Sequence, residues 1–292
     1  MYTIGFRAHD WGMYPSASEL AKAISSVSRP TFVHLAPKRA ILQAPDPRAY
    51  TTDYATRIRK EMEDWGVGIA ILGCHINPIH PDKEEREADL ERFCHALEIA
   101  PFFGCRIVAS ESGSAKADCS YTPETYESRH FDELIESTAR IVGSAERSGS
   151  LACYEGGQHT LNTPSRIERI LKTFPSPHLG LLFDPVNLVP PTGIPEKDGS
   201  VRFHPSEDAQ QRFLADHLDR YANRIVAMHV KNYRMQENGL KTAGMAADKG
   251  VLDWRLVFRM LESYGVKAVM TLENCSPKEA PSTLAYLSAC QQ

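Results

Sequence analysis

Four side chains with the chemistry of metal ligands stand in equivalent places in this sequence, each at the end of a short apolar run. They are Glu155, Asp184, His229 and Glu273. Three carboxylates and one imidazole form an oxygen-rich set that favours Mn²⁺ or Mg²⁺, with Co²⁺ or Zn²⁺ possible. Four protein ligands leave two octahedral positions open, where a hydroxy-carbonyl of a substrate could bind and be polarised. We therefore predict one divalent metal ion here, with Mn²⁺ preferred.

Each of these residues also has an ordinary explanation when it is taken alone. A carboxylate after a strand often caps a helix or pairs with a cation in a loop. A single His after an apolar strand is more often a buried core residue than a ligand. Capping does not readily explain four consecutive strands that end in Glu, Asp, His and Glu. The pattern as a set therefore favours a shared metal site.

The runs before these residues belong to a regular alternation of short apolar segments and longer amphipathic segments. Eight apolar segments are rich in Val, Ile, Leu and Phe, as expected of parallel strands that are buried on both faces. They are residues 2–6, 31–35, 68–72, 106–109, 151–154, 180–183, 225–228 and 268–272. Helical patterns occupy residues 19–26, 52–65, 85–99, 131–146, a segment that opens at Thr163-Pro164, and residues 209–221, 254–264 and 280–289.

Strict alternation of strands and helices calls for a parallel sheet, and eight such strands suit a closed (β/α)₈ TIM barrel. An open, doubly wound sheet is the alternative, but no Gly-x-Gly-x-x-Gly motif follows the first strand. The length of 292 residues suits one barrel, and no linker separates a second unit. We expect residues 1–292 to form a single barrel domain. The carboxyl ends of its strands meet around one mouth, where the four side chains can converge.

Composition limits the partners of this chain. The formal net charge is −4, so no bulk attraction to nucleic acid or to an anionic membrane is expected. The seven cysteines are an odd number and form no Cys-x-x-Cys pair, which is typical of a reduced, cytoplasmic protein. No apolar stretch reaches the ~20 residues that cross a bilayer, and no basic segment of a signal peptide precedes the first strand. We expect a cytoplasmic location.

The segments around the four candidate ligands resemble the xylose isomerase-like TIM barrel superfamily (the sugar phosphate isomerase/epimerase family). This superfamily includes ketose 3-epimerases, inosose dehydratases and hydroxypyruvate isomerases. The resemblance runs over the whole predicted barrel. It is most specific in Tyr154-Glu155, Phe183-Asp184-Pro185-x-Asn187, His229-Val230-Lys231-Asn232 and Leu272-Glu273, with Gly250-Val251-Leu252-Asp253-Trp254 leading into the seventh helix.

The resemblance implies that Glu155, Asp184, His229 and Glu273 bind the metal and that Glu155 and Glu273 are the catalytic acid–base pair. Two carboxylates on opposite sides of a substrate can remove a proton next to a carbonyl from one face and return it to the other. The metal would stabilise the enediolate that forms. Return to the same carbon gives epimerisation, and transfer to the adjacent carbon gives aldose–ketose isomerisation.

Two positions depart from the ketose 3-epimerase pattern. Asn187 stands where those epimerases tend to carry a His, and Val230-Lys231 replaces their Gly-Glu. Both departures are found in the broader, mixed-function members of the superfamily.

Polar residues near other strand ends are candidates for substrate binding, although loop packing or capping explains each one equally well. They are His9, His34, His75, Glu111, Asn187, His159, Lys231 and Arg234. Lys38, Lys231 and Arg234 are also suited to hold a carboxylate or phosphate. No glycine-rich phosphate loop follows the last two strands, which favours an unphosphorylated substrate.

The residues and the resemblance together predict a divalent-metal-dependent isomerase or epimerase of a small sugar or polyol derivative. A lyase on the same metal, such as an inosose dehydratase or an enzyme that cleaves 3-keto-glycosides, begins with the same proton abstraction and stays open. A barrel that binds sugar without catalysis is a further alternative. An abasic-site endonuclease shares the barrel, but Asn187 and the Met228-His229 pair do not match its His-rich site, and the net charge argues against duplex binding. The resemblance also allows a homodimer or homotetramer.

Overall fold

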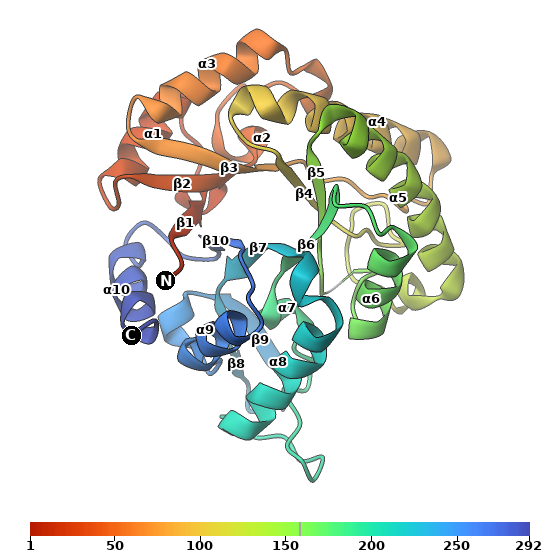
Figure 1. Cartoon of the computed structure of the whole chain (residues 1–292), viewed down its shortest axis with the longest axis vertical. Helices are drawn as coiled ribbons and strands as arrows, with labels where there is room; N and C mark the ends of the chain where they lie inside the picture. The colour runs from red at the N-terminus through yellow and green to blue at the C-terminus, as the bar shows by residue number, and fades with distance from the viewer. Residues whose placement is uncertain (158) are drawn as a thin grey trace.

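In the computed structural model, which describes residues 1–157 and 159–292, eight parallel strands close into a barrel inside a layer of helices (Figure 1). Around the barrel the strands follow in the order β1, β2, β3, β4, β5, β6, β7 and β10, and β10 pairs with β1. Their bounds are β1 (Ile4–Arg7), β2 (Thr31–Leu35), β3 (Val67–Gly73), β4 (Ile107–Glu111), β5 (Leu151–Glu155), β6 (Leu179–Phe183), β7 (Ile225–Val230) and β10 (Val269–Leu272). The predicted (β/α)₈ TIM barrel is confirmed. The first and last residues of each predicted strand lie within two positions of those of the observed strand.

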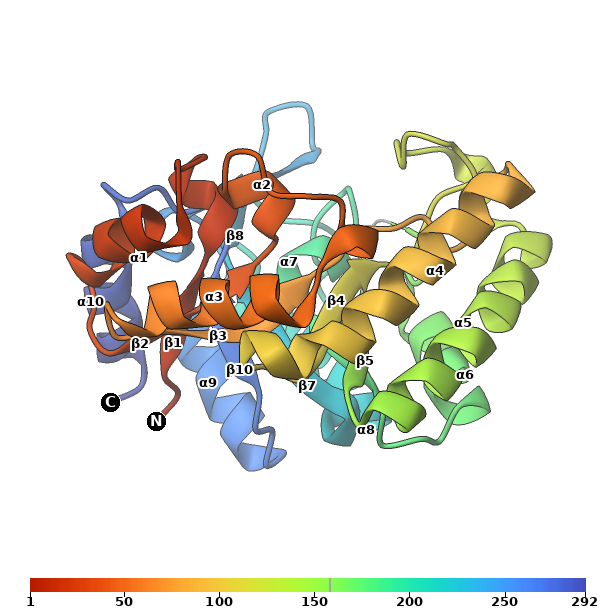
Figure 2. The same cartoon turned by 90° about the horizontal axis from the view of Figure 1, so that it is seen from above.

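The outer layer consists of the eight predicted helices, and Figure 2 shows α3, α4 and α5 along the outside of the strands. The helices are α1 (Ala17–Ser25), α3 (Thr52–Glu63), α4 (Lys83–Ile99), α5 (Ser128–Ser148), α6 (Pro164–Thr173), α8 (Glu207–Tyr221), α9 (Trp254–Ser263) and α10 (Ala280–Cys290). Side chains of Ser16, Thr51, Thr163 and Asp253 cap four of these helices by accepting backbone N–H groups. No helix in the described residues is long and apolar enough to span a lipid bilayer.

The inside of the barrel holds a small apolar cluster that is separate from the larger core between strands and helices. Its members are Ile71, Ala109, Cys153, Leu182 and Ala227. Successive side chains of a strand alternate between faces, so a residue two positions further along points to the same side. Polar residues two positions beyond members of this cluster therefore face into the barrel mouth, above an apolar floor.

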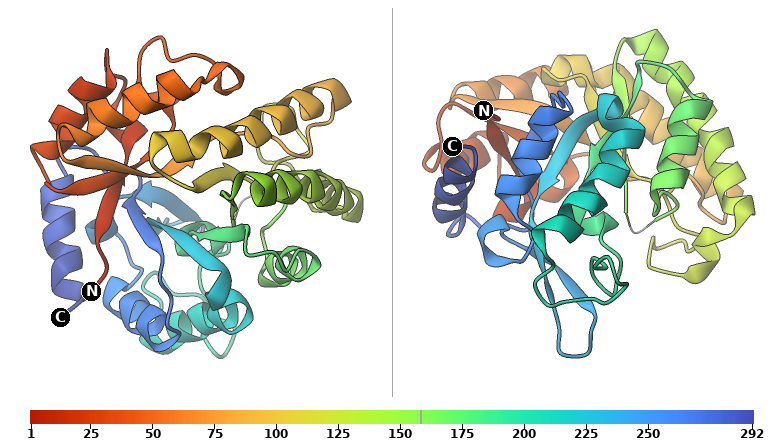
Figure 3. Two further views of the ribbon diagram at one scale, coloured as in Figure 1. Left: turned by 45° about the horizontal axis from the view of Figure 1, so that its top comes forward. Right: turned by 60° about the horizontal axis from the view of Figure 1, so that its bottom comes forward.

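Two short helices and one hairpin, which the sequence did not predict, are added at the mouth. The helices are α2 (Pro37–Ala40) after β2 and α7 (Pro185–Leu188) after β6. The hairpin pairs β8 (Asn232–Met235) with β9 (Lys241–Met245) in antiparallel fashion directly after β7. Figure 3 shows this hairpin extending away from the barrel.

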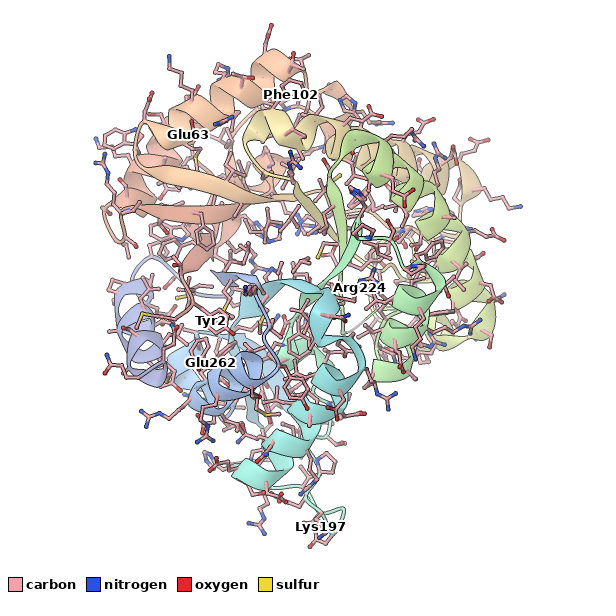
Figure 4. The ribbon with its side chains drawn as sticks, in the orientation of Figure 1. Tyr2, Glu63, Phe102, Lys197, Arg224 and Glu262 are labelled. Carbon is pink, nitrogen blue, oxygen red and sulfur yellow. The ribbon has the colours of Figure 1, made fainter. Side chains whose placement is uncertain are left out.

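The hairpin rests on the long loop that follows α7. The backbone N–H of Lys241 donates to Pro191 O at 2.7 Å, and Lys241 Nζ donates to Val186 O at 2.8 Å. In Figure 4, Lys197 marks the far end of this loop, at a distance from the barrel strands. The part of the loop near α7 and the hairpin thus form one wall beside the mouth.

Asn232 ties the start of the hairpin to the segment that leads into α9. Its amide Nδ2 donates to Ala247 O at 2.7 Å and to Leu252 O at 3.1 Å, and its Oδ1 accepts from Leu252 N at 2.9 Å. The side chain is fully buried. A Cβ at Gly250 would lie 2.3 Å from the Asn232 side chain, so the chain needs a glycine there.

We predict that Asn232→Ala lowers the free energy of unfolding by about 2–4 kcal/mol, because it leaves buried backbone groups without partners. Urea denaturation followed by circular dichroism measures the change. The matched control is Asn238→Ala at the exposed hairpin tip, where one hydrogen bond to Leu240 N is lost and a change of about 0.5 kcal/mol or less is expected. Equal effects of the two substitutions would contradict the bridging role.

Candidate metal centre and substrate pocket

Four neighbouring strands bring the predicted ligand residues to one point at the barrel mouth. Ligand atoms of Glu155, Asp184, His229 and Glu273 all lie within 4.8 Å of one another. Their strands, β5, β6, β7 and β10, are consecutive around the barrel. Asp184, His229 and Glu273 are buried, and Glu155 is half-buried toward the pocket. This is the arrangement that a metal site at the mouth requires.

Asp184 is both a helix cap and a member of the cluster. Its Oδ1 accepts the backbone N–H groups of Val186 at 2.9 Å and Asn187 at 3.0 Å, at the start of α7. Its other oxygen, Oδ2, is buried and makes no hydrogen bond within the described residues. The cap fixes the carboxylate and directs Oδ2 toward the other ligands. Capping and metal binding, which the sequence presents as alternatives, are compatible in this one side chain.

A buried lysine shows that the cluster accommodates a cation. Lys231 Nζ lies 2.6 Å from Asp184 Oδ2 and 2.8 Å from Glu273 Oε2. The Lys231 ammonium is thus the partner of Asp184 Oδ2, which accepts no backbone N–H group. His229 Nδ1 lies 2.9 Å from the same Glu273 oxygen and 3.3 Å from Glu155 Oε1. Carboxylate oxygens and one imidazole nitrogen at this spacing fit a divalent metal ion.

The buried charges shift one another's protonation. Burial alone would lower the pKa of His229, but the carboxylates of Glu273 and Glu155 outweigh it and raise this pKa to about 10. Burial also opposes ionisation of Glu273, yet His229 and Lys231 hold its pKa well below the usual value. For Asp184, burial outweighs the attraction of Lys231, and its pKa is raised. The metal-free cluster therefore holds protons that a bound metal would displace.

A polar pocket of about 310 Å³ opens above the cluster. On its β5 side, Asn187 Nδ2 donates to Glu155 Oε1 at 2.7 Å. On its β3 and β4 side, His75 Nδ1 lies 2.8 Å from Glu111 Oε2. The pocket has the size of a small-molecule site, with polar groups converging from several strands.

Six of the eight predicted substrate-binding residues line this pocket: His34, His75, Glu111, Asn187, His159 and Lys231. His34 Nδ1 lies 3.3 Å from His229 Nε2, and their rings are stacked. His9 lies just behind the lining, with its ring edge-on to His75 at 6.1 Å between centroids. The structure does not bring Arg234 to the pocket, because its exposed side chain donates through Nε to Lys249 O.

Three features of the pocket were missed from the sequence. Arg7, the last residue of β1, donates to Glu273 and pairs with Asp10 at 2.6 Å. It follows the same strand-end rule as the other site residues, but the predicted strand ended one residue too early. Arg39 on α2 also lines the pocket, as do Ala243 and Gly244 of the hairpin. No apolar run or known motif marked α2 or the hairpin in the sequence.

The model of the xylose isomerase-like TIM barrel family matches residues 9–290. A curated relative, an uncharacterized protein of Methanocaldococcus jannaschii, is 25% identical over 129 residues, which are 43% of this chain and 46% of that protein. The matched segment thus spans about half the length of this curated relative.

Solved structures with the same fold cover almost the whole chain. A xylose isomerase-like TIM barrel protein from Mycobacterium smegmatis in complex with magnesium has a TM-score of 0.71 at 15% identity, over 100% of this chain and 98% of its own. The 3-keto-D-glucoside 4-epimerase from E. coli has a TM-score of 0.69 at 15% identity, over 99% of this chain and 100% of its own. The probable 3-DHS dehydratase from Bacillus anthracis has a TM-score of 0.68 at 10% identity, over 98% of each chain. At these identities the likeness shows the fold.

We predict that Mn²⁺ binding releases protons and tightens as pH rises. His229 must be neutral to bind a metal, whereas its pKa of about 10 keeps it protonated at neutral pH in the metal-free protein. The apparent affinity should rise about tenfold per pH unit for each proton displaced, from about pH 6.5 to about pH 8.5. Isothermal titration calorimetry in buffers of different ionisation enthalpy counts these protons.

A matched pair of variants tests the source of the protons. His229→Asn should reduce the proton release, and His204→Asn, at an exposed histidine of the loop after α7, should leave it unchanged. An affinity for Mn²⁺ that stays constant over this pH range would contradict the assignment of His229.

Proposed function

The chain belongs to the xylose isomerase-like TIM barrel family, and from this premise we propose that it is a divalent-metal-dependent isomerase or epimerase of a small sugar or polyol derivative. One observation carries the proposal: ligand atoms of Glu155, Asp184, His229 and Glu273 converge within 4.8 Å below a polar pocket. A sugar epimerase among the structures of the same fold supports it.

We assign Mn²⁺ as the preferred ion, with Mg²⁺, Co²⁺ or Zn²⁺ as alternatives, because three of the four proposed ligands are carboxylates. A structural neighbour in complex with magnesium supports a hard divalent ion. When bound, the metal would stabilise the negative charge that develops on the substrate oxygens next to the reacting carbon. Glu155, Asp184, His229 and Glu273 would hold it.

Glu155 and Glu273 are the proposed proton-transfer pair. They come from β5 and the end of β10, so β6 and β7 separate them around the mouth and they flank a ligand bound at the cluster. Lys231 and Arg7 both contact Glu273 and keep it ionised, which suits a group that accepts a proton. Glu155 accepts a hydrogen bond from Asn187, which orients its carboxylate toward the pocket. One carboxylate takes the proton from the carbon, and the other returns it.

The remaining lining residues would bind substrate hydroxyl groups. His75, with its Nδ1 held by Glu111, presents its buried Nε2, which has no hydrogen-bond partner in the described residues. His159 and His34 stand at other points of the lining. Because these groups lie on β2, in the segment just after β3 and in the loop after β5, they would contact the substrate on several sides. Such a distribution suits a ligand with many hydroxyl groups.

A lyase reaction at the same site is the second candidate, and the probable dehydratase among the structures of this fold favours it. Elimination starts with the same proton abstraction and then expels a hydroxyl or alkoxyl group. The protein is incubated with Mn²⁺ and ketoses, inososes or 3-keto-glycosides in D₂O. NMR spectra of the products then distinguish the lyase reaction from epimerisation or isomerisation. Deuterium at carbon without loss of a group indicates epimerisation or isomerisation, and loss of water or of a glycosyl leaving group indicates a lyase.

Three broader expectations stay proposals. We propose a single barrel domain for residues 1–292, and assembly as a homodimer or homotetramer. We also propose a reducing, cytoplasmic environment, in keeping with seven cysteines that are all free.

We predict that Glu155→Gln and Glu273→Gln, saturated with Mn²⁺, still bind substrate but lose turnover by about 10²–10⁴-fold, because each removes a general base and keeps the side-chain shape. Deuterium exchange from D₂O into the substrate, followed by NMR, measures the loss. Glu63→Gln, on the outside of α3 (Figure 4), is the matched control and should exchange at the original rate. Near-normal exchange in both active-site variants would refute the two-carboxylate mechanism.

We predict that chelation of the metal abolishes activity and that Mn²⁺ or Mg²⁺ restores it. Bound metal should also raise the melting temperature, because it binds only the folded state. Asp184→Asn should weaken metal affinity first, so that excess metal recovers part of its activity. Full activity in protein shown by mass spectrometry to be metal-free would exclude this mechanism.

A further inference from the structure

A second pocket, of about 240 Å³, adjoins the metal pocket and shares two of its lining residues, Arg39 and His75. It lies between α2, the short helical turn at Pro47–Ala49, the end of β3 and the inner side of α4. Its wall also contains Lys38, Asp46, Tyr50 and Arg92. A ligand that reaches past His75 would therefore pass from the metal cluster into this second pocket.

The two pockets differ in charge. In the metal pocket the carboxylates are matched by cations such as Arg7 and Lys231, whereas the lining of the second pocket has Lys38, Arg39 and Arg92 against Asp46, with Asp89 behind it paired to Arg92. Asp46 is shared among several cations: Lys38 Nζ lies 3.7 Å from its Oδ2, Arg92 Nε lies 3.6 Å from the same oxygen, and Arg48 Nε lies 3.0 Å from its Oδ1. The lining of the second pocket thus has an excess of positive charge.

Arg39 contributes most directly to this excess. Its guanidinium makes no ion pair and no side-chain hydrogen bond within residues 1–157 and 159–292, and it lines both pockets. An unpaired guanidinium presents several N–H donors in a planar fork that matches a carboxylate or a phosphate. Its position at the junction of the two pockets places these donors next to any ligand that spans them.

Buried donors without partners face the same space. Tyr50 is 3% exposed and lines the second pocket, and its Oη has no hydrogen-bond partner in the described residues; the buried Arg92 Nε makes no hydrogen bond either, although Asp46 Oδ2 lies 3.6 Å away. Burial raises the pKa of Tyr50, so its phenol stays protonated and can donate. Leaving buried donors without acceptors is unfavourable. An acceptor-rich group in this pocket would satisfy both of these donors.

We propose that the second pocket binds an oxyanion group, a carboxylate or a phosphate, at the far end of the substrate whose polyol end lies at the metal cluster. The inference rests on the proposed function for the reacting end, and it deepens that proposal by assigning an acidic substrate. Arg39 and Arg92 supply the charge, and Tyr50 supplies a directed donor. The expectation of an unphosphorylated substrate is compatible with the carboxylate form. Phosphate recognition here would depend on side chains and not on a glycine-rich loop.

The oxyanion site can be tested without turnover. Inorganic phosphate and acetate are titrated separately into the metal-free, full-length protein by calorimetry at constant ionic strength. Arg39→Gln should weaken binding of the preferred anion about tenfold or more, because a charged donor is lost. Tyr50→Phe keeps the ring and should weaken it about two- to tenfold. Arg255→Gln is the matched control, because Arg255 is exposed in the first turn of α9 and lines neither pocket; this variant should bind as the original protein does.

The outcomes distinguish the source of the anion. Tighter binding of phosphate assigns a phosphorylated substrate, and binding of acetate that equals or exceeds it assigns a carboxylate. The proposal is overturned if neither anion binds at millimolar concentration, or if binding is the same in Arg39→Gln, Tyr50→Phe and the original protein. Because this titration requires neither metal nor catalysis, its failure leaves the metal-dependent reaction standing. Loss of metal binding would likewise leave the oxyanion site standing.

Discussion

Balance of charge in the barrel mouth is the constraint on which the site depends. Asp184 and Glu273 are buried carboxylates beside a third, Glu155, and such groups repel one another strongly in a medium of low polarity. In the metal-free protein Lys231 and the protonated His229 supply the compensating positive charge. A divalent ion bound among the same oxygens would supply this compensating charge.

The same balance explains why Arg7 stands where it does. Glu273 already contacts Lys231 and His229, and Arg7 adds a third positive group from β1, which is the next strand around the barrel. Asp10 in turn neutralises Arg7 and accepts the backbone N–H of Asn274 at 2.7 Å. The closure of the barrel between β10 and β1 is therefore reinforced by charges that converge on the site. Arg7, Asp10 and Glu273 therefore contribute both to the closure of the barrel and to the candidate site.

The sequence predicted the barrel and its ligand cluster because both follow from simple periodic rules. Apolar runs such as residues 180–183, alternating with helical segments, are typical of buried parallel strands, and the polar residue that ends each run then lies at the common mouth. The rules fail where the chain leaves the repeat. Tyr233 of β8 is buried, but β8 and β9 are short and mixed in polarity, so no alternation marks them. Arg234 was expected at the pocket but is exposed and donates to Lys249 O, because the direction of a side chain on an unforeseen hairpin cannot be read from its position after a strand.

Beyond its anchored base at Asn232 and Tyr233, the hairpin stands outside the strand pairing of the barrel. Its strands pair only with each other in the described residues, and none of the barrel's strand-to-strand contacts passes through them. Yet Ala243 and Gly244 form part of the pocket wall. Changes in the length or sequence of the hairpin can therefore remodel the wall while the barrel registers stay intact. The four candidate ligands stand on barrel strands or directly after them, whereas this part of the wall stands on an added element, so the geometry of the cluster and the shape of the wall can change independently.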